Sequence, residues 1–135
     1  MALIEWNQSL SVGVVQFDQQ HHQLVTMLND LHAAMQRGEG SQVLDTVLGD
    51  LIAYTRDHFT AEEILMEYHD YPDFQHHMRA HRLLVEQVHA IQDRVKSGRP
   101  LQPTSVMQFL VNWLTNHILT EDKNYRSFFQ ARGVT

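Results

Sequence analysis

Apolar residues recur at steps of three and four along four segments of the chain, and each such line of residues is here called a stripe. The first stripe contains Leu24, Leu28, Leu31 and Met35. Steps of this size place side chains on one face of an α-helix. The other stripes are Leu44, Leu48, Leu51 and Leu65, then Leu84, Val88, Ile91 and Val95, and finally Val106, Leu110 and Leu114. We therefore expect four amphipathic helices, at about residues 18–37, 41–68, 73–97 and 104–122.

Glycine and proline separate these segments and mark the connections between them. Gly38 follows the first segment, Pro72 the second and Gly98 the third. Ser41 and Asp73 are suitable N-caps for the second and third helices. Four helices of similar length with short connections predict an all-α fold, an up-down-up-down four-helix bundle.

The ends of the chain carry aromatic and branched residues outside the predicted helices. We expect residues 1–17 to form an ordered arm and residues 123–135 to form a short tail that covers the bundle. A chain of 135 residues has the usual size of one domain. The whole chain, residues 1–135, is therefore interpreted as a single domain.

Composition limits the class of function. Hydrophobic residues make up 43% of the chain and charged residues 19%, which is too apolar for a disordered segment. The net charge is −6 with scattered basic residues, so binding to nucleic acid or to an anionic membrane surface is not expected. The sequence shows neither a secretory signal nor a long apolar run, and we expect a cytoplasmic protein without a membrane span. With no long exposed apolar face evident, we expect a monomer.

Histidine and cysteine usage changes the picture. The chain has no cysteine and 10 histidines. Disulfides, thiolate zinc sites and iron–sulfur clusters are thereby excluded. Any metal ion must be bound by nitrogen and oxygen.

Several histidines and one acid continue the apolar stripes, so they should point into the bundle. They are His21 in the first helix, His58 and Glu62 in the second, His77 and His81 in the third, and His117 in the fourth. His22 and His76 lie one position off their stripes, although the doubled histidines leave them as alternates. Because neighbouring helices run antiparallel, all the inward positions fall at the same end of the bundle.

A single histidine on an apolar face is usually a core residue with an ordinary hydrogen-bond partner, but five of them are hard to explain in this way. Each buried polar group without a partner costs about 1–3 kcal/mol, against a total stability of about 5–15 kcal/mol. Metal ions would supply the missing partners. Five imidazoles with one or two acids exceed the needs of one four-coordinate ion, so we predict two metals.

The identity of the second acid stays open at the level of spacing. Glu121 lies four residues after His117 and shares its helix face. Asp122 lies one position further, about 140° away from His117 on an ideal helix. Periodicity favours Glu121, whereas a distorted last turn would admit Asp122.

Four stretches of the chain resemble the hemerythrin family, in particular its single-domain bacterial members. IEWNQSLSVGVVQFDQQHHQL is similar to the family's N-terminal arm and first-helix opening. HFTAEE, HMRAH and WLTNHILTED are similar to its second-, third- and fourth-helix motifs. The resemblance covers essentially the whole chain, and the four motifs occur in the family's order.

The resemblance implies a non-heme diiron site that binds dioxygen reversibly. One iron would be bound by His77, His81 and His117, and the other by His21 and His58. Glu62 and Asp122 would bridge two iron ions (Fe2+/Fe3+), together with an oxo or hydroxo group. On family grounds, Asp122 is thus the expected second acid.

The implied function is oxygen transport, storage or delivery, with an oxygen-consuming enzyme as a possible recipient, and not catalysis. Stripe residues are expected to line or cap the dioxygen pocket, namely Leu24, Leu28, Thr55, Leu84, Trp113 and Leu114.

Three other functions compete with oxygen carriage. A diiron oxidase or iron store of the ferritin type needs two Glu-x-x-His motifs, whereas this chain has one such spacing, Glu86 with His89, off the third stripe. A module that senses dioxygen or redox state, and a buffer for iron or nitric oxide, would use the same site chemistry.

Overall fold

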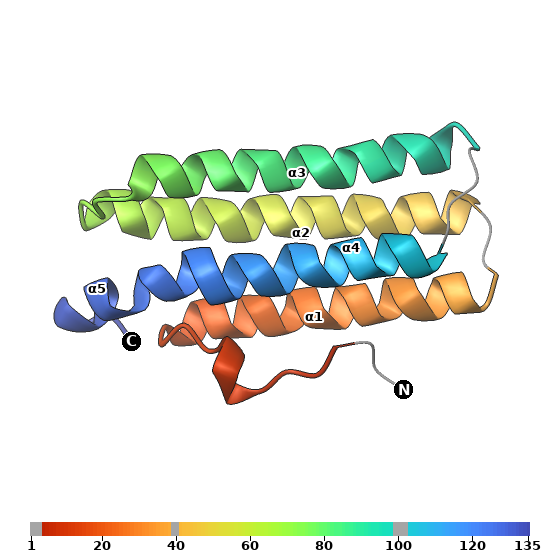
Figure 1. Ribbon diagram of the computed structural model, residues 1–135. Helices are drawn as coiled ribbons and strands as arrows, with labels where there is room; N and C mark the ends of the chain where they lie inside the picture. Colours follow the sequence, from red (N-terminus) through yellow and green to blue (C-terminus); the bar gives the residue numbers. More distant parts are fainter. Residues whose placement is uncertain (1–3, 39–40, 99–102) are drawn as a thin grey trace.

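The computed structural model describes residues 4–38, 41–98 and 103–135, and four long helices lie side by side along most of this length (Figure 1). They are α1 (Val15–Gln36), α2 (Ser41–Tyr68), α3 (Phe74–Lys96) and α4 (Pro103–Asn116). Successive helices run in opposite directions (Figure 1). The predicted all-α, up-down-up-down bundle is confirmed, and the described residues contain no strand.

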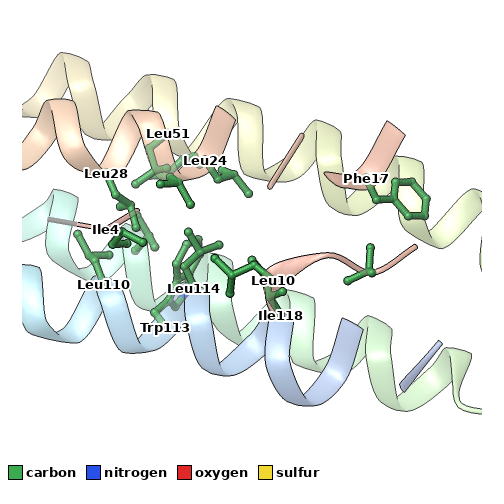
Figure 2. Packing of buried hydrophobic residues seen from close by; sticks show 14 of the residues in the cluster. Ile4, Leu10, Phe17, Leu24, Leu28, Leu51, Leu110, Trp113, Leu114 and Ile118 are labelled. Carbon is green, nitrogen blue, oxygen red and sulfur yellow. The ribbon is translucent and has the colours of Figure 1, made fainter. Parts of the chain in front are cut away.

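The apolar stripes form the core, as their spacing predicts. Leu24, Leu28, Leu51, Leu110 and Leu114 are buried and converge from three helices in Figure 2. Full burial of one such side chain contributes about 1.5–3 kcal/mol. The hydrophobic effect therefore drives the four stripes together and determines which way every other residue on these helices faces.

The N-terminal arm is attached to α1 by paired hydrogen bonds, and it contains a short 3-10 helix, η1 (Gln8–Leu10). The Ile4 N–H donates to Asn29 Oδ1, and Asn29 Nδ2 donates to the Ile4 carbonyl, both at 2.9 Å. Asp18 Oδ1 accepts the Val12 N–H at 2.8 Å. The arm is ordered over its described part, as expected.

The first helix begins earlier than expected, at Val15 and not at about residue 18. Gly13 turns the chain with a φ of 78°, which glycine adopts without steric cost. Asp18 then lies in the first turn of α1, where its carboxylate accepts hydrogen bonds from Ser11 and Val12. An acid in the first turn interacts favourably with the helix dipole, so helix formation starts before it.

The fourth helix does not run uniformly to residue 122. After α4 the chain continues as a π-helix, η2 (His117–Asp122), and the tail forms a further short helix, α5 (Arg126–Ala131). Tyr125 and Phe129 are fully buried, so the tail covers one end of the bundle as predicted. Within the described ranges, no helix combines the length and hydrophobicity needed to cross a membrane.

Candidate metal centre

Seven polar side chains from all four walls of the bundle meet in one buried layer. Their exposed fractions lie between 0 and 7%. They are His21 from α1, His58 and Glu62 from α2, His77 and His81 from α3, and His117 and Asp122 from η2. The structure thus brings together every residue that was expected at the site.

The seven residues form two overlapping groups. One contains His77, His81 and His117, the other contains His21 and His58, and each group also includes both Glu62 and Asp122. Within a group, one nitrogen or oxygen atom from each residue lies within 4.8 Å of the others. Two ions could therefore be held side by side with the two carboxylates between them.

Asp122 lies at the centre of the cluster. Its Oδ1 is 3.0 Å from both His77 Nε2 and His117 Nε2, and its Oδ2 is 3.0 Å from His21 Nε2. Glu62 faces it, with Oε1 3.1 Å from His81 Nε2. Glu62 Oε2 lies 3.6 Å from both His21 Nε2 and His58 Nε2, so each of the two carboxylates faces histidines of both groups.

The π-helical turn explains how Asp122 reaches the cluster. In this turn the Lys123 N–H donates to the Ile118 carbonyl, five residues earlier, so each turn holds more residues than an α-helical turn. His117 and Asp122 consequently share one face. Glu121 turns outward, where His76 Nε2 lies 3.2 Å from its carboxylate.

The alternates that spacing left open lie outside the cluster. His76 is 60% exposed. His22 is also exposed, and its ring meets the edge of Trp6 at 5.8 Å. The stripe predictions for His21 and His77 therefore agree with the structure.

The donor atoms of the cluster fit metal ions, because many of them are buried without a hydrogen-bond partner. These atoms are the Nε2 atoms of His21, His58, His77, His81 and His117, together with Glu62 Oε1 and both Asp122 carboxylate oxygens. The close approaches around Asp122 do not have hydrogen-bond geometry. Imidazole and carboxylate donors suit iron and neighbouring transition metals.

The directions of the pKa shifts also favour positive charge beside the two carboxylates. Burial alone would lower the pKa of His21 and His77, but the carboxylates of Asp122 and Glu62 raise it to about 10 in both. Burial would raise the pKa of Glu62 and of Asp122, but the surrounding histidines hold both well below their usual values. These shifts favour protonated imidazoles at His21 and His77 beside ionised Glu62 and Asp122 in the metal-free protein.

Three contacts support the cluster from outside. Gln20 Oε1 lies 2.5 Å from His58 Nδ1, and Glu63 Oε2 lies 3.0 Å from His81 Nδ1. The buried Tyr125 hydroxyl donates to Glu62 Oε2 at 2.5 Å. Such outer partners fix the orientation of metal ligands.

Sequence reasoning did not assign these three contacts. Tyr125 follows the π-helix, so no helical spacing connects it with Glu62. Glu63 belongs to the HFTAEE motif as the second of two adjacent acids, which was the one available signal for its role.

A small cavity of about 10 Å³ touches both groups. This is about the space that one water molecule needs. Its walls include Leu24, Leu84, Trp113 and Leu114, as expected, with Phe59 and Ile118 in addition. Leu28 and Thr55, which were also expected, are buried elsewhere and do not line it.

Comparisons with known proteins agree with this arrangement. The family model "Hemerythrin HHE cation binding domain" matches residues 12–128, a range that includes all seven residues. A bacteriohemerythrin of Stenotrophomonas maltophilia (strain R551-3) is 37% identical over 134 residues, 97% of this chain and 84% of the relative. One from Methylococcus capsulatus (strain ATCC 33009 / NCIMB 11132 / Bath) is 32% identical over 126 residues, 93% of this chain and 95% of that one.

Solved structures show the same fold. The crystal structure of a wild-type hemerythrin has a TM-score of 0.86 to this chain at 31% identity, covering 93% of this chain and 97% of the other.

Proposed function

Because this chain belongs to the hemerythrin family, we propose that it binds two iron ions at the seven-residue cluster and carries dioxygen reversibly. The observation that supports this most directly is the sharing of Glu62 and Asp122 by two adjacent groups of histidines. A single ion would leave one of those groups of buried nitrogens without a partner.

We assign the ligands according to these groups. His77, His81 and His117 would bind one iron, and His21 and His58 would bind the other. Glu62 and Asp122 would be shared by the pair, together with an oxo or hydroxo group. When bound, the irons supply the electrons that dioxygen takes up and later returns.

The remaining side chains hold the ligands in position. Tyr125 donates its hydroxyl hydrogen to Glu62 Oε2, which fixes the orientation of this carboxylate. Gln20 accepts from His58 Nδ1, so that Nε2 faces the cluster with its lone pair. A rigid arrangement of this kind keeps the metal-binding atoms in place while dioxygen enters and leaves.

The unequal number of histidines suggests where dioxygen binds. The group of His21 and His58 has one imidazole fewer than the other, and both of these residues border the cavity. The other cavity walls are largely apolar, and the Trp113 Nε1–H is already donated to the Leu84 carbonyl at 3.1 Å. A pocket with largely apolar walls, whose indole N–H is already used, favours carriage over oxidation of a substrate.

We further propose that the protein works as a cytoplasmic monomer that delivers dioxygen to an oxygen-consuming enzyme. The large exposed apolar residues support the monomer, because they are distributed over several elements, from Val15 on α1 to Phe109 on α4. Sedimentation velocity with and without dioxygen tests the monomeric state. A stable dimer in either condition would contradict that part of the proposal.

The experiment that tests oxygen carriage is the optical spectrum of the reduced, iron-loaded protein, recorded without air, after air and after degassing, with iron counted per chain. We expect two irons per chain and a visible band that appears with air and disappears on degassing. A single irreversible conversion to a ferric spectrum would contradict carriage and favour an oxidase, a sensor or an iron store.

A further inference from the structure

The two outer contacts to His58 and His81 differ in charge. His58 Nδ1 faces the neutral amide oxygen of Gln20, whereas His81 Nδ1 faces the carboxylate of Glu63. Both partners only accept hydrogen bonds at these atoms, so each Nδ1 carries the hydrogen. Because His58 and His81 belong to different groups of the cluster, the two proposed iron positions have unequal surroundings.

Glu63 is placed to act through its charge. Its side chain is 25% exposed, and its Oε2 lies 3.0 Å from His81 Nδ1. It lies in a surface groove of about 410 Å³ that is lined by residues of α2 and α3, among them Arg56 and Glu86. The negative charge is therefore one imidazole ring away from the cluster.

The orientation of the His81 ring does not depend on Glu63 alone. The ring stacks on Phe59 with centroids 3.7 Å apart and an angle of 1° between the planes. Its Nε2 lies 3.1 Å from Glu62 Oε1. A change of charge at Glu63 can therefore be separated from a change of ring position.

We propose that Glu63 is a positioning residue that makes the site of His77, His81 and His117 the tighter metal position and the one that is oxidised first. A carboxylate that accepts from a ligating imidazole makes the ligand a stronger donor. Its charge also stabilises Fe(III) more than Fe(II), since Coulomb attraction grows with the charge of the ion. This inference rests on the proposed pair of irons.

The electron balance is simple. In the first step, the Fe(II) held by His77, His81 and His117 loses one electron to an added chemical oxidant and becomes Fe(III). The iron held by His21 and His58 remains Fe(II) until the second step. No atom is transferred in either step.

The first test is a redox titration of the iron-loaded protein, followed optically with soluble mediators. Glu63→Gln keeps an acceptor at this position but removes the charge. We expect Glu63→Gln to lower the equilibrium constant of the first oxidation at least tenfold. For one electron, a tenfold change corresponds to a rise of about 59 mV in the reduction potential of that iron. Gln20→Glu should instead lower the reduction potential of the second oxidation, and so reduce the difference between the two reduction potentials.

The second test needs no iron chemistry. Co2+ binding to the metal-free protein is measured in competition with a chelator. Glu63→Gln should weaken the tighter of the two sites by about 10–100-fold, as is typical when an outer partner of a ligand is lost. Glu86→Gln is the matched control, because it removes a negative charge from the same groove, and no hydrogen bond joins Glu86 to His81 in the described part of the chain.

The outcomes separate the two proposals. If the wild-type protein holds two irons but Glu63→Gln matches Glu86→Gln in both tests, this inference is wrong and the proposed function stands. If the wild-type protein holds fewer than two irons, the proposed function fails and this inference fails with it. If Glu63→Gln does not fold, Gln20→Glu is the deciding variant. An unchanged difference between its two reduction potentials would overturn the inference.

Discussion

The hydroxyl of Tyr125 lies 2.5 Å from Glu62 Oε2, although the two residues are 63 positions apart and both are fully buried. Hydrogen bonds to charged groups contribute about 1.5–3 kcal/mol. Tyr125→Phe should therefore lower the free energy of unfolding of the metal-free protein by about this amount. Urea unfolding measures it.

The matched control is Tyr68→Phe, because Tyr68 is 79% exposed. Its stability should stay within about 0.5 kcal/mol of the wild type. Equal free energies of unfolding for Tyr125→Phe and the wild type would show that the hydrogen bond from Tyr125 to Glu62 does not stabilise the fold.

The second prediction concerns the two neighbouring acids at the end of η2. Asp122→Asn should lower the iron content per chain, because the charge at the centre of both histidine groups is lost. Glu121→Gln should leave it unchanged, since this side chain faces His76 at the surface. Iron counted per folded chain measures the difference, and the reverse order would contradict the placement of Asp122.

A third prediction uses the doubled histidines. His77→Ala should remove iron from the three-histidine position, while His76→Ala, at an exposed neighbour, should retain full occupancy. His21→Ala and His22→Ala form the same kind of pair on α1. Full iron occupancy in His77→Ala would refute the ligand assignment.

The fourth prediction is a pH dependence of the metal-free protein. The folded-state pKa of His21 and of His77 is raised from 6.5 to about 10, because Asp122 and Glu62 outweigh the effect of burial. The stabilisation from these protons is complete below about pH 6.5 and is lost as the pH rises toward 10. The free energy of unfolding should fall by up to about 1.4 kcal/mol per pH unit for each proton that the folded protein binds and the unfolded chain does not.

Urea unfolding at a series of pH values between 6.5 and 10 measures this loss. The pKa of His58 is lowered by burial to about 4, so its titration affects stability only below this window. The iron-loaded protein should not lose stability in the same way, because the metals replace the protons. A flat profile for the metal-free protein would argue against a protonated cluster.

Much of the fold and of the centre could be predicted from local sequence. The spacing of Leu24 and Leu28, or of Leu110 and Leu114, specifies which helix face is buried, because the α-helix repeats every 3.6 residues. His21, His58 and His81 continue the same spacing and must point inward with it. The antiparallel order of the helices then places them at one end.

Helical spacing alone could not decide between Glu121 and Asp122, and the family resemblance that favoured Asp122 gave no physical reason for the choice. Regular spacing from His117 favours Glu121, and the π-helical turn reverses this choice by adding residues to the turn before Asp122. The pairs of Glu62 with Tyr125, His58 with Gln20 and His81 with Glu63 were likewise settled only in three dimensions. Periodicity along one helix specifies a face, whereas contacts between helices depend on how the helices pack and where their turns deviate from the regular repeat.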